Sequence, residues 1–133
     1  KNDNCNCCSK FNDEITNAML EAALKTAKEL GIEVAQKVEV TGAFEIPFAT
    51  KQLLEKKDIH GVATLGAVIK GETDHDQVIA HSVAKKLLDL SCEYNKPVSL
   101  GISGPNISRE QATVRSLEYG KRSVVAVFEL LKQ

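Results

Sequence analysis

The sequence predicts an α/β fold, a three-layer α/β/α sandwich around a parallel sheet of about four strands. Strand-like and helix-like stretches alternate along the whole chain. Such alternation is built most simply as a parallel sheet with right-handed crossovers and helices on both faces. In addition, residues 61–69 (GVATLGAVI) are a nearly unbroken apolar run, which is typical of a strand covered on both faces.

The first half of the chain is expected to hold two strands and two helices. Residues 4–9 (NCNCCS) are a short first strand, the least convincing element because it contains two asparagines. A helix follows from Glu14 to Leu30, with Asn12 and Asp13 before it as N-cap candidates and Gly31 after it as a stop signal. Residues 32–40 are rich in β-branched side chains and predict a second strand. The next helix starts near Pro47 and reaches about Lys56.

The second half begins with the apolar strand at 61–69 and continues with the same alternation. The apolar spacing of residues 77–93 predicts a helix with one broad apolar face. Residues 97–103 (PVSLGIS) predict another buried strand. The pattern Ser108-x-x-Gln111 is a capping box that opens a helical region to the C-terminus, with Gly120 as a candidate break or bend.

Length and charge exclude several classes of protein. The 133 residues are expected to form one domain, residues 1–133. Seventeen basic and eighteen acidic residues give a net charge of −1, which supplies no broad field to attract nucleic acid or an anionic membrane. No apolar run approaches the roughly 18 residues that span a bilayer. A cytoplasmic protein without nucleic-acid or membrane partners is therefore expected.

The four cysteines do not predict a metal site. Cys5, Cys7 and Cys8 crowd the N-terminus and Cys92 stands alone, and no second cysteine pair completes a zinc-binding pattern. Small buried side chains in a short strand are the preferred interpretation of the N-terminal three, and a reducing compartment fits this cysteine usage.

The candidate site lies where the strands end. Ligands of an open parallel sheet bind beyond the carboxyl ends of the strands. The four segments that leave the strands are rich in glycine, hydroxyl, amide or charged residues: SKFND, TGAFEIP, KGETDHD and SGPNISREQ.

Two features of the third segment have a functional and an ordinary interpretation. The run Gly71-Glu72-Thr73 precedes a helix, so it is either an anion cradle of backbone N–H groups or an ordinary glycine loop with Thr73 as the cap. His75 is either a neutral imidazole poised for proton transfer or a surface histidine. The surface interpretation is preferred for His60 and His81.

The other candidates also keep two interpretations each. Phe11 and Phe44 either stack on a flat heterocycle or belong to the core. Glu45 either accepts a hydrogen bond from a ligand or is solvated. Arg115 either binds a phosphate with two hydrogen bonds or makes a surface ion pair.

Taken together, the segments SKFND, GAFEIP, GAVIKGETDHD and PVSLGIS…EQA..R resemble the lumazine synthases of riboflavin biosynthesis. The resemblance extends from Ser9 to the end of the chain and is to the archaeal branch. It implies a flavodoxin-like sheet and an enzyme that condenses 5-amino-6-(D-ribitylamino)uracil with 3,4-dihydroxy-2-butanone 4-phosphate, without metal or organic cofactor. It also implies a homo-oligomer, a pentamer that in some members assembles into a shell of sixty subunits.

The resemblance also implies roles for individual residues. His75 matches the proton-transfer histidine, and Phe11 would stack on the pyrimidine. Leu100 matches a position that reaches the substrate from the neighbouring subunit. The ribityl chain and the ring edge would be held by Ala43, Phe44, Glu45, Ala67, Val68 and Ile69, and the phosphate by Glu72, Thr73, Arg115 and Arg122.

Two alternatives to this function are left open. One is the homologous archaeal-type riboflavin synthase, which dismutates the lumazine; the intact GAFEIP and KGETDHD segments favour the lumazine synthase. The other is a non-catalytic flavin-binding or shell-forming relative. The presence of Phe11, Glu45, Thr73, His75 and Arg115 together argues against a decayed site.

Overall fold

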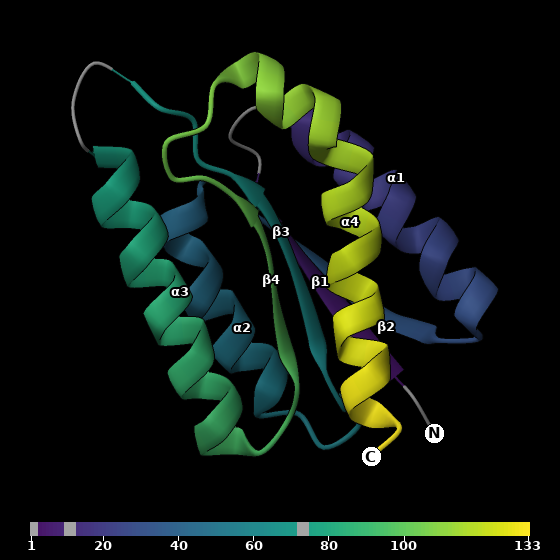
Figure 1. Ribbon diagram of the computed structural model, residues 1–133. Helices are drawn as coiled ribbons and strands as arrows, with labels where there is room; N and C mark the ends of the chain where they lie inside the picture. Colours follow the sequence, from purple (N-terminus) through teal and green to yellow (C-terminus); the bar gives the residue numbers. More distant parts are fainter. Residues whose placement is uncertain (1–2, 10–12, 72–74) are drawn as a thin grey trace.

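The computed structural model describes residues 3–9, 13–71 and 75–133, with side chains from residue 14 onward. Strands and helices alternate along the chain (Figure 1), and a 3₁₀ turn, η1 (Ala43–Glu45), precedes the second helix. The strands are β1 (Asp3–Ser9), β2 (Glu33–Val40), β3 (Val62–Ala67) and β4 (Val98–Ser103), and the helices are α1 (Asp13–Leu30), α2 (Ile46–Leu54), α3 (His75–Tyr94) and α4 (Arg109–Leu131).

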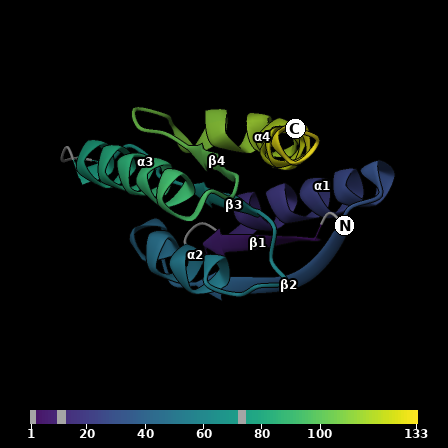
Figure 2. The ribbon, with the colours of Figure 1, turned by 90° about the horizontal axis from the view of Figure 1, so that it is seen from below.

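The four strands form one parallel sheet in the order β2-β1-β3-β4. This is the order of a flavodoxin-like sheet. Helices α2 and α3 cover one face and α1 and α4 the other (Figure 2). The predicted three-layer sandwich with four parallel strands is therefore confirmed. Strand β1, predicted as the least convincing element, is a central strand that pairs with both β2 and β3.

Each face of the sheet has its own apolar core. On the α2–α3 side the core includes Leu53 and Leu90, and on the α1–α4 side it includes Met19 and Val124. All six residues of β3 are buried, because this strand lies between the two cores and supplies side chains to both. The prediction of a strand covered on both faces is thus confirmed for β3.

The prediction that β4 is also a buried strand is wrong in part. Leu100, in the middle of β4, is 52% exposed, whereas Gly101, Ile102 and Ser103 are buried. The reason is position: β4 pairs only with β3 and forms one edge of the sheet. An apolar sequence alone does not distinguish an edge strand from an internal one.

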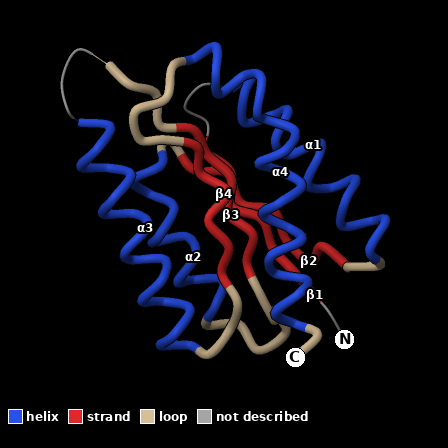
Figure 3. Tube along the Cα trace, viewed as in Figure 1, coloured by secondary structure: helices blue, strands red, loops and turns tan. Residues whose placement is uncertain are grey.

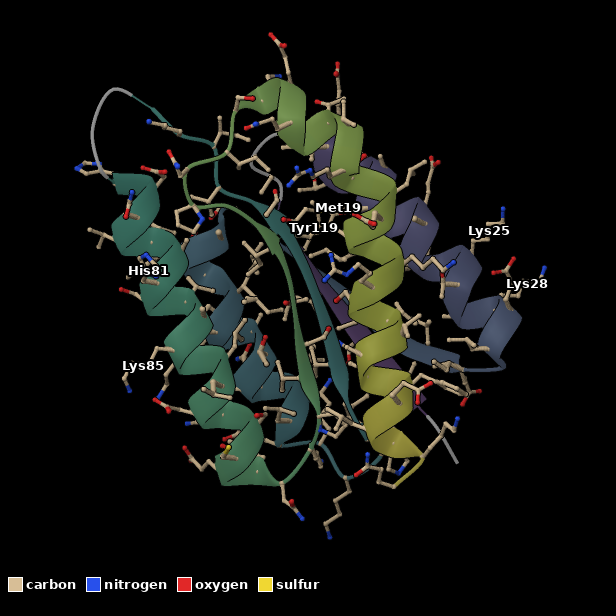
Figure 4. All side chains as sticks on the ribbon, viewed as in Figure 1. Met19, Lys25, Lys28, His81, Lys85 and Tyr119 are labelled. Atoms are coloured by element: carbon tan, nitrogen blue, oxygen red, sulfur yellow. The ribbon has the colours of Figure 1, made fainter. Side chains whose placement is uncertain are left out.

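Gly120 does not break the last helix. The capping box is confirmed, with the Ser108 hydroxyl accepting from the Gln111 N–H at 3.1 Å, and α4 then runs without interruption to Leu131. A Cβ on Gly120 would lie 2.2 Å from the carbonyl oxygen of Met19. The glycine therefore permits α1 and α4 to approach closely, at the place where Figure 4 labels Met19 and Tyr119.

A network of three buried hydroxyl groups lies where α4 packs on the sheet. Ser123 donates to the carbonyl oxygen of Thr64 at 2.9 Å, and its Oγ lies 2.5 Å from the Oγ of Ser99. The Thr64 hydroxyl in turn donates to the carbonyl oxygen of Ser99. Gly101 leaves the space for this network, because a Cβ there would lie 2.2 Å from the Thr64 carbonyl oxygen. Every hydroxyl of the network thus has a partner, as burial requires.

The two remaining histidines differ in exposure, and the described helices fall short of a membrane span. His81 is exposed on α3 (Figure 4), as predicted, but His60 is half-buried, so the surface interpretation is wrong in part for His60. Within the described ranges, no helix has the length and apolarity needed to cross a bilayer.

Candidate active site

A cavity of about 310 Å³ opens at the carboxyl end of the sheet, between the exits of β2 and β3 and the start of α3. Figure 3 shows the loops that meet at this end, in tan. Seven of the predicted site residues line the cavity: Ala43, Phe44, Glu45, Ala67, Val68, Ile69 and His75. The segment at Ala43–Glu45 precedes the other two by more than twenty residues, and the parallel sheet brings all three to one edge.

The exit of β2 supplies one wall of the cavity through the turn η1. Ala43 is buried and Phe44 is 65% exposed, so the phenyl ring stands at the surface of the cavity rather than in the core. The carboxylate of Glu45 accepts a hydrogen bond from the Thr41 hydroxyl at 3.2 Å. Pro47 follows in the first turn of α2, where its missing N–H costs nothing.

The exit of β3 supplies the floor. Ala67 and Val68 are buried and Ile69 is half-buried. The N–H of Val68 donates to the Ser103 carbonyl at 2.8 Å, so pairing with β4 continues beyond the last residue of β3. Gly104 makes this possible, because it has φ +106° and a Cβ there would lie 2.3 Å from the Val68 carbonyl oxygen.

The start of α3 supplies the titratable groups. His75 is the first residue of the helix and is exposed, and Asp76 beside it is 5% exposed. The positive end of the helix dipole lies at this end of α3. An exposed imidazole at the edge of a cavity with apolar walls is placed to exchange protons with a bound molecule.

The structure does not bring every predicted residue to the cavity. Leu100 lies on the edge strand β4, and Arg115 and Arg122 are exposed on α4; none of the three lines the cavity. The remaining predicted residues, Phe11, Glu72 and Thr73, lie outside the described residues.

Four lining residues were missed by the sequence analysis: Gly42, Gly71, Asp76 and Ile79. The two glycines belong to the segments TGAFEIP and KGETDHD, so their position at the strand exits could have identified them as lining residues. Ile79 is one turn beyond His75 on the same face of α3, at the helical spacing of four residues. Asp76 gave no signal, because an aspartate in the first turn of a helix is ordinary.

The described lining of the cavity is mainly apolar, with two carboxylates, Glu45 and Asp76, and one imidazole. Among these lining residues there is no lysine or arginine. The described part of the chain also contains no group of three or more histidine, cysteine or acidic residues that could hold a metal ion. Within this chain, the described walls therefore offer hydrogen-bond acceptors and a proton carrier, but no cation for a phosphate.

Comparison with known proteins identifies the family. The family model described as 6,7-dimethyl-8-ribityllumazine synthase matches residues 5–133. A curated protein of that name from Methanopyrus kandleri is 50% identical, over 94% of this chain and 88% of its own. The enzyme of the same name from Metallosphaera sedula is 52% identical over 94% and 83%. That from Methanocaldococcus jannaschii is 46% identical over 94% and 88%.

These matches cover nearly the whole chain, including the segments that form the cavity. The α/β fold with its parallel sheet is consistent with this family. The chain therefore belongs to the 6,7-dimethyl-8-ribityllumazine synthase family, and its function is the family's transferase step in riboflavin biosynthesis.

Proposed function

We propose that the cavity between η1, the exit of β3 and the start of α3 is where this chain condenses 5-amino-6-(D-ribitylamino)uracil with 3,4-dihydroxy-2-butanone 4-phosphate. The observation that supports this best is the meeting of His75 with the apolar wall formed by Val68 and Ile69 and with the exposed ring of Phe44. A flat heterocycle needs an apolar surface and a stacking partner, and the condensation needs a proton carrier beside them.

The reaction requires positioning more than a strong nucleophile. The amine of the pyrimidine attacks the ketone and water leaves, giving an imine; phosphate is then eliminated, and ring closure releases a second water. Holding the two reactants side by side can supply about 7–11 kcal/mol of the barrier through effective molarity. Proton transfer through His75 would contribute a further ~10²–10⁴-fold.

The other lining residues would bind the pyrimidine substrate. Phe44 is proposed to contact the ring, and Glu45 to accept hydrogen bonds from the ring edge or the ribityl hydroxyls. The buried backbone at Ala67, Val68 and Ile69 would fix the depth at which the ring lies. Exchange of protons by His75 would then take place at the open side of the cavity, where this histidine is exposed.

The phosphate site is proposed to be completed by a second copy of the chain. A phosphate needs cationic partners, and the described lining of the cavity contains two carboxylates but no lysine or arginine. Arg115 and Arg122 are exposed on α4, outside the cavity of their own chain. Exposed apolar side chains beside them, Val114 at 82% and Leu117 at 60%, support an interface on this helix.

The assembly proposed is a homopentamer, with the larger icosahedral shell as its further stage. Leu100, 52% exposed on the edge strand β4, would reach the neighbouring copy's substrate. A cytoplasmic location is proposed as well, because the free thiol of Cys92 is exposed on α3 and free thiols persist in a reducing compartment. Cell fractionation tests that location.

A mixed-substrate assay that follows lumazine absorbance tests the catalytic proposal. His75→Ala should lower kcat by about 10²-fold and leave measurable activity, because positioning survives the substitution. His81→Ala is the matched control: this histidine is exposed on the same helix, outside the cavity (Figure 4), and its loss should leave kcat unchanged. A His75→Ala enzyme as fast as the parent would remove the proposed role.

Two further measurements separate the remaining alternatives. Lumazine supplied alone should give no riboflavin; its dismutation would favour the riboflavin synthase alternative. Light scattering should give the mass of a pentamer or of a multiple of it. Leu100→Asp should reduce that mass and Leu88→Asp, at an even more exposed leucine on α3, should not. An active parent monomer would contradict the shared site.

A further inference from the structure

Asp76 is a buried carboxylate whose hydrogen bond crosses from the start of α3 to the loop between β4 and α4. It is in the first turn of α3 and only 5% exposed, although it lines the cavity. Its Oδ2 accepts from the backbone N–H of Asn106 at 2.9 Å. Asn106 has φ 60°, in the left-handed region that asparagine adopts more readily than most residues. The bond therefore holds a turn in the loop between β4 and α4 against the start of α3.

Two backbone hydrogen bonds link the segments beyond β3 and β4 to each other. The N–H of Val68 donates to Ser103 O at 2.8 Å, and the N–H of Lys70 donates to Ile107 O at 2.9 Å. Both of these links join backbone to backbone. In Figures 1 and 3 the two loops run together at this end of the sheet, close to the start of α3. The Asp76 bond joins this pair of loops to the helix that begins with His75.

The position of Asp76 determines what this link can control. The first turn of a helix lacks intrahelical partners for its N–H groups and is the part that frays most readily. Consecutive residues of an α-helix differ in direction by about 100°. When the Asp76 side chain is held inward against Asn106, the direction in which His75 leaves the helix is fixed with it.

We propose that Asp76 is a positioning residue, whose hydrogen bond to the Asn106 N–H fixes the first turn of α3 and thereby the direction of the His75 imidazole toward the cavity. The proposal rests on the proton-transfer role proposed above for His75. Asp76 itself exchanges no proton with the substrate. The loop that it binds leads directly into α4, so the same bond also fixes the start of that helix relative to His75.

Two substitutions separate the hydrogen bond from the charge. Asp76→Asn keeps an oxygen that can accept from the Asn106 N–H, so kcat should stay within about threefold of the parent. Asp76→Ala removes the acceptor, so kcat should fall by at least about tenfold, and the pH profile of kcat should lose the limb contributed by His75. Asp89→Ala, which removes an exposed carboxylate paired with Lys85 on the same helix, is the matched control and should change neither.

A double-mutant cycle tests whether Asp76 acts through His75. In the His75→Ala background, Asp76→Ala should lower kcat by less than about twofold, because the group that it positions is already absent. Thermal unfolding of each variant reports whether the protein is folded under assay conditions. If Asp76→Ala does not fold, Asp76→Asn measured alone and in the His75→Ala background carries the test.

The outcomes are distinguishable. Additive losses from Asp76→Ala and His75→Ala would overturn the positioning role and leave the proposed role of His75 intact. An Asp76→Asn enzyme that folds but is as slow as Asp76→Ala, or as slow as His75→Ala, would also overturn it, because the charge rather than the bond would then matter. A His75→Ala enzyme as fast as the parent would instead remove the proposed function of His75, and the positioning role with it.

Discussion

Replacing Gly120 with alanine tests whether the close approach of α1 and α4 holds the two helices together. In most helix interiors this change would stabilise the protein by about 1 kcal/mol, because alanine is the better helix former. Here the added Cβ would lie 2.2 Å from the Met19 carbonyl oxygen and 2.9 Å from the carbonyl carbon, whereas ordinary contact begins at 3.4 Å. The atoms that it meets belong to the backbone of α1, so no side-chain rotation relieves the overlap.

The helices must therefore separate by about 1 Å, and overpacking of this kind costs up to about 3 kcal/mol. After the gain in helix propensity, the expected net loss of unfolding free energy is about 2 kcal/mol. In a chain of 133 residues this lowers Tm by roughly 6–10 °C. The measurement is thermal unfolding followed by circular dichroism at fixed protein concentration, because assembly would make Tm depend on concentration.

Gly71→Ala is the matched control, because a Cβ on Gly71 would meet nothing within 4 Å. Its Tm should remain within about 2 °C of the parent, since no overpacking occurs there. The reasoning would be refuted by a Gly120→Ala protein that melts at or above the parent temperature. Such a result would mean that α1 moves aside at no cost, and that the close approach contributes nothing to stability.

Two further predictions concern substrate binding and are measured by steady-state kinetics. Phe44→Ala should raise KM for the pyrimidine substrate by about tenfold, since stacking contributes about 0.5–1.5 kcal/mol beyond area burial. The same change should leave Tm unchanged because Phe44 is 65% exposed. The control is Phe48→Ala, at a similarly exposed ring outside the cavity, which should not alter KM. Arg115→Ala should raise KM for the phosphorylated ketone by at least about tenfold and leave KM for the pyrimidine unchanged. The control is Lys121→Ala, on the same helix, which should change neither KM value. Equal effects on both substrates would contradict the phosphate role of Arg115.

Much of the fold could be predicted because each element carries its own local signal. The apolar run of β3 indicated burial on both faces, and the Ser108–Gln111 capping box indicated the first turn of α4; both are confirmed. Strand β1 gave a poor signal because its composition is polar. Its central position follows from backbone pairing with β2 and β3, which does not depend on side-chain type.

The parts that could not be predicted depend on contacts between distant segments. The exposure of Leu100 follows from the position of β4 at an edge of the sheet that the described strands form, and no local pattern records that. A glycine such as Gly120 produces the same local sequence signal at a bend and at a helix contact. Asp76 is ordinary in its own helix, and its significance depends on Asn106, thirty residues away in the chain. The residues of the candidate site were found more readily, because strand exits are rich in glycine and polar side chains.

The buried hydroxyls of Thr64, Ser99 and Ser123 have a consequence for the outer surface of α4. If this helix turned about its axis or slid by one turn, the Ser123 hydroxyl would lose the Thr64 carbonyl oxygen and the Ser99 hydroxyl would lose Ser123, and unpaired polar groups are costly in a buried interior. The helix thus has one permitted rotational setting. The directions in which Arg115 and Val114 face outward are consequently determined by the interior of their own protomer. A neighbouring chain would therefore contact a surface whose orientation is fixed before binding.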